Sequence, residues 1–169
     1  MSDEPLLSVR DLTKQYTSSR GGMLSRETTR VTAVDGVSFD IYRGEALGLV
    51  GESGCGKSTT ASSILRLTEP TSGEVVFNGG GRESAIRPDD GSHPNDVTRF
   101  DRAELKSFRR DAQLIFQDPT SSFDPRMSVG ASIAELPLVH GMTDPERRRA
   151  IVADLLERVG LSADDYDRY

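Results

Sequence analysis

The chain has 169 residues, 35% of them hydrophobic, and this size and composition fit a folded domain with a core of its own. No run approaches the roughly 20 apolar residues of a membrane span, and the first residues lack the pattern of a secretion signal. A net charge of −6 argues against nucleic acid as a partner. One cysteine, Cys55, and two histidines without ligand spacing exclude a disulfide framework and a cysteine-built metal site.

The basic residues are strongly biased toward arginine. Of the 21 lysines and arginines, only Lys14, Lys57 and Lys106 are lysines. Two explanations remain open: adaptation to high salt, where surface carboxylates keep proteins soluble, and a GC-rich genome that favours arginine codons. Stability that does not change between low and molar KCl would remove the first explanation.

The first half of the chain predicts strands followed by a helix. Residues 6–16 and 36–43 alternate apolar and polar side chains, which predicts strands with one buried face, joined by a polar loop. Residues 46–50 are apolar without interruption, as in a strand that is covered on both faces in a parallel sheet. A helix is predicted from Lys57 to about Leu67, and a further strand over 74–77.

The middle of the chain is less regular. Residues from about 79 to 100 are rich in Gly, Pro and Asp and lack a sustained period, which predicts a surface insertion. A short charged helix is predicted over 101–111, and a buried strand over 113–116.

The last part predicts two helices. The first runs over 128–136 and is expected to stop at Pro137. The second runs over 143–159, where Thr143 and Glu146 have the spacing of a capping box. Its apolar positions form one stripe, so it is expected to pack on one side.

One motif carries recognisable chemistry, and it directly follows the apolar run 46–50. The pattern G-x-x-x-x-G-K-[ST] is matched without departure by Gly51, Glu52, Ser53, Gly54, Cys55, Gly56, Lys57 and Ser58. The glycines let successive backbone N–H groups point into one concavity, which binds phosphate oxygens at the start of the following helix. Lys57 can reach the β- and γ-phosphates, the Ser58 hydroxyl can ligate Mg²⁺, and Thr59 can contact the α-phosphate side.

Two alternatives concern this loop. The first is that the loop is a glycine-rich turn with a purely structural role, which would need the same glycines. The strand predicted before the loop and the helix predicted after it favour nucleotide binding. Cys55 occupies an unconstrained position of the motif, either as inert filler or as a reactive thiol activated by the helix N-terminus and Lys57.

The loop alone does not separate kinases, GTPases and transport ATPases, but the surrounding sequence does. Taken in order and spacing, residues 33–41, 44–59, 69–75 and 108–119 strongly resemble the ATP-binding subunits of ABC transporters. Residues 121–130 and 154–161 point to the branch that imports oligopeptides and dipeptides. The resemblance implies an α/β P-loop NTPase with a central, mainly parallel sheet, an antiparallel β part at the start and the beginning of a helical subdomain. It divides the chain into 1–118, a partial ATP-binding core, and 119–169.

The resemblance also implies roles for residues outside the loop. Tyr16 matches the aromatic residue that stacks on adenine, with a core tyrosine as the alternative. Gln117 matches the glutamine that reaches Mg²⁺ and the attacking water, with a solvated loop amide as the alternative. Together with Lys57, Gln117 is expected to serve catalysis. The groove that receives a helix of the membrane partner is expected to involve Ser121, Ser122, Phe123 and Asp124.

The cofactors and partners implied by the family are ATP, Mg²⁺, transmembrane permease subunits and a second ATP-binding subunit, identical or different. An extracytoplasmic solute-binding protein would take part indirectly. The expected location is the cytoplasmic face of the cell membrane, and no nucleic acid is expected.

Three elements of the family are not found in the 169 residues: the serine-glycine signature loop, the apolar strand that ends in acidic residues, and the switch histidine. The sequence is therefore expected to represent an amino-terminal portion that binds Mg-ATP without hydrolysing it, whereas the complete family members are ATPases. The alternatives are a non-catalytic or vestigial P-loop module and a soluble P-loop kinase.

Overall fold

The computed structural model describes residues 4–20, 27–80, 93–118 and 123–169. The chain forms two compact units, Met1–Leu114 and Ile115–Tyr169. Each unit has its own secondary structure and packing, and the two are described in turn.

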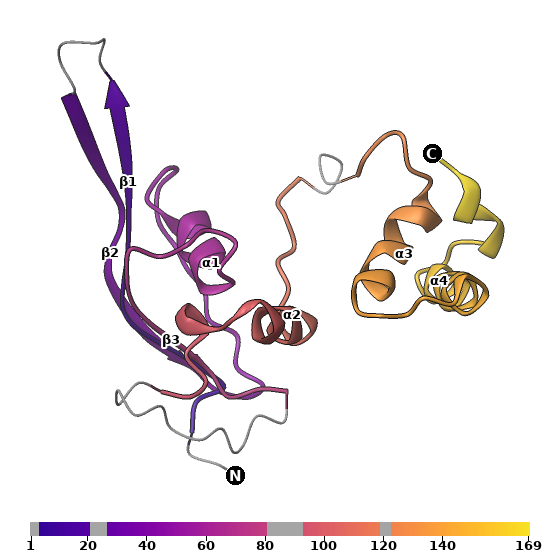
Figure 1. The fold of residues 1–169 in the computed structure, drawn as a ribbon, viewed down its shortest axis with the longest axis horizontal. Coiled ribbons are helices and arrows are strands. Elements are labelled where there is room, and N and C mark those ends of the chain that lie inside the picture. Colours follow the sequence, from indigo (N-terminus) through magenta and orange to yellow (C-terminus); the bar gives the residue numbers. More distant parts are fainter. Residues whose placement is uncertain (1–3, 21–26, 81–92, 119–122) are drawn as a thin grey trace. The chain divides into compact units, whose positions relative to one another are not determined.

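The first unit contains an antiparallel sheet (Figure 1). Its described strands are β1 (Leu7–Arg20), β2 (Glu27–Ile41) and β3 (Ser72–Phe77), in the order β2-β1-β3. β3 pairs only with the first half of β1, so the β1–β2 hairpin continues beyond it as a two-stranded ribbon. Three of the five predicted strands, those over 6–16, 36–43 and 74–77, correspond to β1, β2 and β3. Residues 17–20 and 27–30, expected in a loop, are paired with each other.

A bulge in β1 aligns the strand with the core. Val9 and Leu12 are both fully buried although they are three positions apart, a spacing that puts side chains on opposite faces of a regular strand. The register shifts between them, and Asp11 adopts a positive φ of 48°. The extra residue therefore turns both side chains to the same face.

The core of the first unit lies between the sheet and α2 (Arg102–Asp111). Phe108 of α2 is fully buried, and its ring lies edge-on to those of Phe77 at 5.1 Å and Phe100 at 6.1 Å. Asp101 caps the helix, and a capping box with Glu104 completes its start. The helix predicted over 101–111 is confirmed.

Residues 95–100 do not fit the expected surface insertion. Val97 and Phe100 are buried in the core, and Val97–Arg99 forms a short 3₁₀ helix. The buried Asp96 accepts the Val75 N–H at 3.2 Å, and the Phe77 N–H donates to the Asn95 carbonyl at 3.1 Å. Composition suggested a loop, but two apolar side chains and a bonded carboxylate join this segment to β3. Residues 81–92 of the expected insertion lie outside the described residues.

Neither of the strands predicted for a parallel sheet is formed. Residues 46–50 and 113–116 have no regular structure, and Val50 and Ile115 are 95% and 91% exposed. A strand buried on both faces needs neighbours on each side, and the described residues offer none to either segment. The described sheet is accordingly antiparallel throughout, and the expected parallel part is not observed in it.

The second unit is helical, with α3 (Val129–Val139), α4 (Pro145–Arg158) and a 3₁₀ helix at Ala163–Asp167. Ser128 caps α3 by accepting the Ala131 N–H at 3.2 Å. The prediction that Pro137 ends this helix is wrong. Proline removes only its own N–H, and the His140 N–H still donates to the Leu136 carbonyl at 3.1 Å, one turn further on.

The cap of α4 also differs from the prediction. Asp144, not Thr143, accepts the N–H groups of Glu146 at 3.0 Å and Arg147 at 3.2 Å. A carboxylate accepts these two bonds and also carries a charge that favours the helix N-terminus. Two members of the predicted apolar stripe, Val152 and Leu156, are buried.

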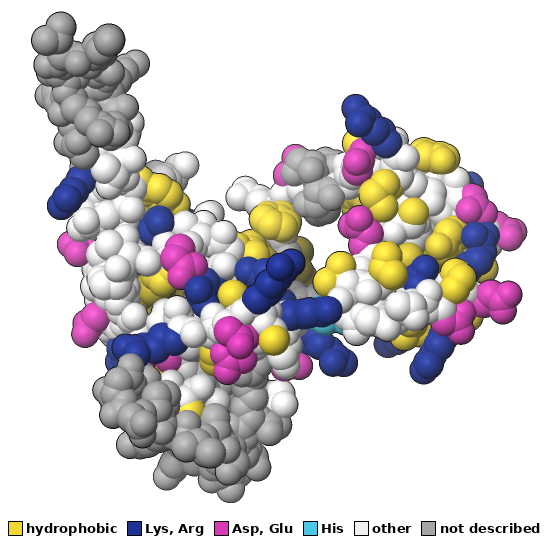
Figure 2. Space-filling model, viewed as in Figure 1, with side chains coloured by type: hydrophobic (Ala, Val, Ile, Leu, Met, Phe, Trp, Pro, Cys, Tyr) yellow, Lys and Arg dark blue, Asp and Glu magenta, His cyan; other side chains and the backbone are white. Residues whose placement is uncertain are grey.

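Many apolar side chains of the second unit lie on its surface (Figure 2). The large exposed ones in its described part are Ile115, Phe116, Phe123, Leu136, Leu138, Val139, Leu155, Val159, Leu161 and Tyr169. Across the described ranges of the chain, no helix combines the length and the apolar character that crossing a bilayer requires. An apolar surface of this kind is typical of a site for another protein.

Candidate nucleotide site

The phosphate loop leads directly into α1 (Lys57–Ile64). The first bond within the helix runs from the Thr60 N–H to the Gly56 carbonyl at 2.8 Å, so the preceding N–H groups of the first turn have no acceptor in the helix. The first turn contains no acidic side chain. These amides and the positive end of the helix dipole together favour an anion.

Gly56 is required at the start of α1 for two reasons. Its φ of +97° lies in the left-handed region, which side chains with a Cβ rarely adopt. A Cβ at this position would also overlap the carbonyl oxygen of Ala33 on β2. The loop therefore packs directly on the sheet, and this contact places the helix N-terminus beside β2.

Lys57 bends back over the loop that precedes it. Its Nζ donates to the carbonyl oxygens of Gly51 at 2.8 Å and Glu52 at 2.6 Å, and it lies 3.4 Å from the Sγ atom of Cys55. The ammonium is thus held beside the open amides of the helix, where a phosphate chain would meet both. Cys55 is exposed.

The hydroxyl groups after Lys57 differ in their environment. Ser58 is exposed, and its hydroxyl makes no hydrogen bond with any described residue, so its oxygen is available to Mg²⁺, which prefers oxygen ligands. Thr59 is partly buried. Thr60 is buried, and its Oγ1 donates to the Gly56 carbonyl at 3.0 Å. This contact was not predicted, although a threonine four residues after a helix-starting glycine is the sequence signal for it.

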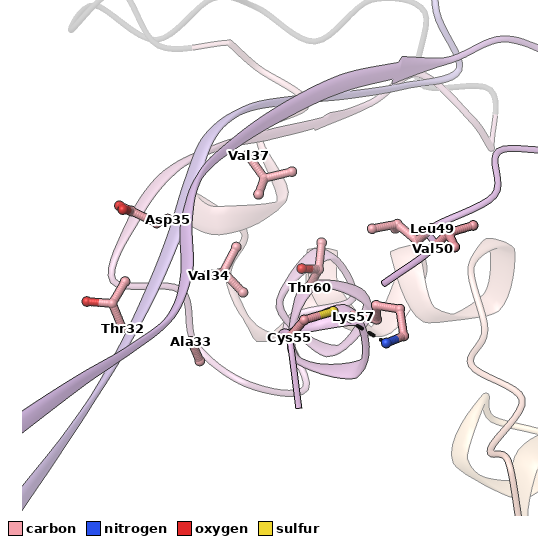
Figure 3. A pocket seen from close by; sticks show the side chains of 10 residues that line it. All are labelled: Thr32, Ala33, Val34, Asp35, Val37, Leu49, Val50, Cys55, Lys57 and Thr60. Atoms are coloured by element: carbon pink, nitrogen blue, oxygen red, sulfur yellow. Dashed lines mark hydrogen bonds between the residues drawn. The ribbon is translucent and has the colours of Figure 1, made fainter. Parts of the chain in front are cut away.

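A pocket of about 290 Å³ lies between β2 and the loop (Figure 3). Its lining residues are Thr32, Ala33, Val34, Asp35, Val37, Leu49, Val50, Cys55, Lys57 and Thr60. Val34 and Val37 lie on the side of β2 that faces α1. The pocket thus joins an apolar wall to the ammonium of Lys57. The contribution of Ala33 and Val34 to the site was not predicted, because it depends on pairing between distant segments.

Tyr16 lies on β1 opposite Val31 and outside this pocket. Tyr16 is 46% exposed, so it is not among the core residues of the described chain. The Nζ atom of Lys14 lies 4.9 Å from the centre of its ring, a distance at which a cation is attracted to an aromatic face.

Gln117 belongs to the second unit, in the irregular segment before residue 119, and is exposed. Of the residues expected in the partner groove, Phe123 and Asp124 are exposed, whereas 121 and 122 lie outside the described residues. Asp124 accepts the Arg126 N–H at 2.9 Å, which shapes the turn before α3.

A glycine-rich loop that opens its amides at the start of a helix, with a lysine ammonium beside them, defines the chain as a P-loop nucleotide-binding domain. Residues 34–169 match the family described as ABC transporter, and the chain belongs to this family.

Relatives with described roles cover nearly all of the chain. It is 46% identical over 166 residues to the glutathione import ATP-binding protein GsiA of Shigella dysenteriae serotype 1 (strain Sd197) and of Escherichia coli (strain K12). These matches cover 98% of the chain and 24% of each relative, so the chain spans about a quarter of their length.

Solved structures show the same fold. The ATP-binding cassette MJ0796, in a dimeric post-hydrolysis state bound to ADP and Pi, aligns with a TM-score of 0.66 and 25% identity, over 96% of this chain and 60% of that one. The cbiO1 protein of Clostridium perfringens, part of the ABC transporter complex cbiONQ, aligns with a TM-score of 0.59 and 22% identity, over 94% of this chain and 52% of that one. The fold is therefore that of ABC ATPase cassettes, over the part of those chains that this chain covers.

Proposed function

We propose that this chain is the ATP-binding part of an ABC importer that carries peptides or a similar small solute. The observation that carries the proposal is the position of Lys57, whose ammonium is held by the carbonyls of Gly51 and Glu52 beside the open amides of α1. The cargo class is supported by the 46% identity to a protein named for glutathione import, since glutathione is a small peptide.

Each residue of the proposed site has a separate role. The amides of residues 51–59 bind the phosphates, and Lys57 neutralises their charge. Ser58 and Gln117 hold Mg²⁺, which would offset the charge of the β- and γ-phosphates, and Gln117 also orients the attacking water. Tyr16 stacks on the adenine.

The proposed partners are transmembrane permease subunits and a second ATP-binding subunit, with a solute-binding protein acting outside the membrane. The exposed apolar side chains of the second unit, among them Phe123 and Leu138, support a protein partner on that unit. The dimer described for MJ0796 supports a second ATP-binding subunit. This assembly would lie on the cytoplasmic face of the cell membrane.

For the 169 residues themselves, we propose binding of Mg-ATP without turnover. This part of the proposal rests on the sequence expectation that these residues do not include the signature loop and the acidic strand end that the family uses for hydrolysis. The chain would then act as a binding module, and phosphoryl transfer to a small acceptor, as in a soluble kinase, is not expected.

Calorimetry with Mg-ATP tests the proposal. Lys57→Ala should abolish the heat of binding, because it removes the cation held at the loop, whereas Lys106→Ala should leave it unchanged. Lys106 is an exposed lysine on α2 and provides a matched loss of charge. The folded chain giving no heat with Mg-ATP, or Lys57→Ala giving the same heat as the unaltered chain, would refute the proposal. Release of phosphate above background would refute the absence of turnover.

A further inference from the structure

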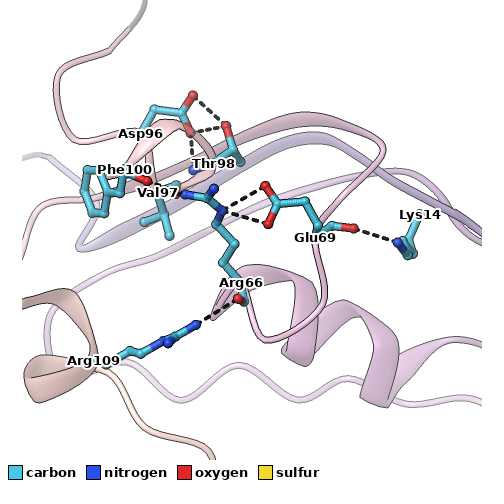
Figure 4. A network of polar contacts seen from close by, with 8 residues as sticks. All are labelled: Lys14, Arg66, Glu69, Asp96, Val97, Thr98, Phe100 and Arg109. Carbon is cyan, nitrogen blue, oxygen red and sulfur yellow. Dashed lines mark hydrogen bonds and ion pairs between the residues drawn. The ribbon is translucent and has the colours of Figure 1, made fainter. Parts of the chain in front are cut away.

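Arg66 follows α1 and brings several parts of the first unit together at one guanidinium group (Figure 4). Its Nη1 donates to the carbonyl oxygens of Val97 at 3.2 Å and Phe100 at 2.6 Å. Its Nε donates to both carboxylate oxygens of Glu69 at 2.9 Å. The Arg66 carbonyl in turn accepts from Nη2 of Arg109 on α2 at 3.0 Å. The end of α1 is therefore tied to the 97–100 segment and to α2.

The backbone and side chain of Arg66 are both constrained. Its φ of 48° is positive, which is uncommon for a residue with a Cβ, and only 18% of its side chain is exposed. An exposed ion pair with Glu69 alone would contribute little. The two carbonyl contacts are different, because they are partly buried and need the planar fork of an arginine.

The turn after Arg66 continues this connection to β1. The Glu69 carbonyl accepts from Nζ of Lys14 at 2.7 Å, and Oγ1 of Thr71 accepts the Gln15 N–H at 2.9 Å. Lys14 also lies over the ring of Tyr16. A continuous set of polar contacts therefore runs from the end of α1, the helix that follows the phosphate loop and is called the phosphate helix below, to the part of β1 that carries Tyr16.

The orientation of α1 depends on contacts at its two ends. Its two buried side chains, Thr60 and Ser63, are polar, and no apolar stripe runs along the helix. Ile64 and Leu65 pack against the core, and both lie at the C-terminal end next to Arg66. The helix is thus held at both ends, by Gly56 against Ala33 of β2 at its start and by these contacts at its C-terminal end.

We propose that Arg66 is a positioning residue that holds the phosphate helix at a fixed spacing from Tyr16, so that one nucleotide reaches both at once. This inference rests on the proposed function. Two weak subsites bind a linked ligand tightly only when their spacing matches it. Arg66 would therefore strengthen binding of ATP, which spans both subsites, more than binding of tripolyphosphate, which occupies the loop alone.

The test is to measure the affinities of the folded chain for ATP and for inorganic tripolyphosphate, each with Mg²⁺. Arg66→Ala should weaken ATP binding about tenfold and tripolyphosphate binding by less than about threefold. Arg66→Lys should restore only part of the ATP affinity. Arg10→Ala should change neither affinity, since Arg10 lies on the same sheet but contacts Asp40, away from α1.

A double-mutant cycle supplies the decisive readout. In a chain that already carries Tyr16→Ala, Arg66→Ala should weaken ATP binding by less than about threefold, because the second subsite is gone. If Arg66→Ala lowers both affinities equally, or neither, the inference is overturned. If Arg66→Ala does not fold, Arg66→Lys replaces it, because lysine keeps the charge but lacks the planar fork that reaches the Val97 and Phe100 carbonyls. ATP binding should then still weaken more than tripolyphosphate binding, and equal losses would overturn the inference. Failure of the proposed function would look different, since the unaltered chain would then bind neither ligand.

Discussion

Gly56 of the phosphate loop lies against the carbonyl oxygen of Ala33 on β2, so closely that no side chain fits between them. We therefore expect Gly56→Ala to abolish Mg-ATP binding and to destabilise the first unit, because the loop must move away from the sheet. Calorimetry measures the binding, and thermal unfolding measures the stability.

Gly141 provides the matched control for this substitution. It has a similar φ of +96°, with nothing within 4 Å of an added Cβ. Gly141→Ala should therefore show only the backbone strain, about 1–2 kcal/mol, with unchanged nucleotide affinity. Equal effects of the two substitutions on ATP binding would contradict a role for the contact with Ala33.

The single cysteine offers a direct footprint of the site. Cys55 is exposed and its Sγ lies 3.4 Å from Nζ of Lys57, so a bound phosphate chain should block access to the thiol. With Mg-ATP at about ten times its dissociation constant, alkylation by iodoacetamide should slow about tenfold. Adenosine, which lacks phosphates, serves as the control, and mass spectrometry follows the modification. Protection by adenosine equal to that by Mg-ATP would argue against phosphate binding at the loop.

The ion pair between Arg10 and Asp40 predicts a pH dependence of stability. Nη2 of Arg10 donates to Oδ2 of Asp40 at 2.8 Å, and this hydrogen bond lowers the pKa of the Asp40 carboxyl below its ordinary value. The folded state favours the carboxylate form of Asp40, so the ion pair stabilises the fold at pH values above the pKa of an aspartate in the unfolded chain, about 3.9. This stabilisation is lost as the pH falls through the lower pKa of Asp40 in the folded state.

Asp40→Asn should remove this part of the acid dependence. Denaturant unfolding at pH 7 and at successively lower pH measures the free energy of unfolding of both chains. The unaltered chain should be more stable than the variant at pH 7, and this difference should disappear in acid. A difference between the two that stays constant down to pH 2 would contradict the assignment. Asp154→Asn provides a control, since Asp154 is exposed on α4 in the other unit.

Tyr166 should stabilise the second unit. Its ring packs against Gly130 of α3, where an added Cβ would overlap it, and Arg149 of α4 lies 4.1 Å from the ring centre. Tyr166→Ala should therefore destabilise this unit by about 1–3 kcal/mol, as measured by limited proteolysis and thermal unfolding. Tyr166→Phe keeps the ring and should stay near the unaltered chain. A loss with phenylalanine as large as that with alanine would show that the ring contacts are not the cause.

Much of the local structure was predictable from the sequence. Helices α1, α2, α3 and α4 and strands β1 and β3 were expected near their observed positions, because side-chain periodicity is local in the chain. Of β2 only the last part was expected, within the strand predicted over 36–43. The errors have physical causes. Thr143 was preferred as a cap although the next residue, Asp144, is the better acceptor, and two segments that read as buried strands have no neighbouring strand among the described residues.

The candidate site was also only partly predictable from the sequence. The sequence by itself determined the phosphate loop, since a glycine pattern followed by Lys57 and Ser58 dictates backbone geometry within a few residues. Only the tertiary structure decided that Ala33 supports the loop, that Val97 and Phe100 are core residues, and that Arg66 ties the end of α1 to their carbonyls. These contacts link residues that are distant in sequence, and such pairs form only when the whole first unit folds, so no local pattern records them.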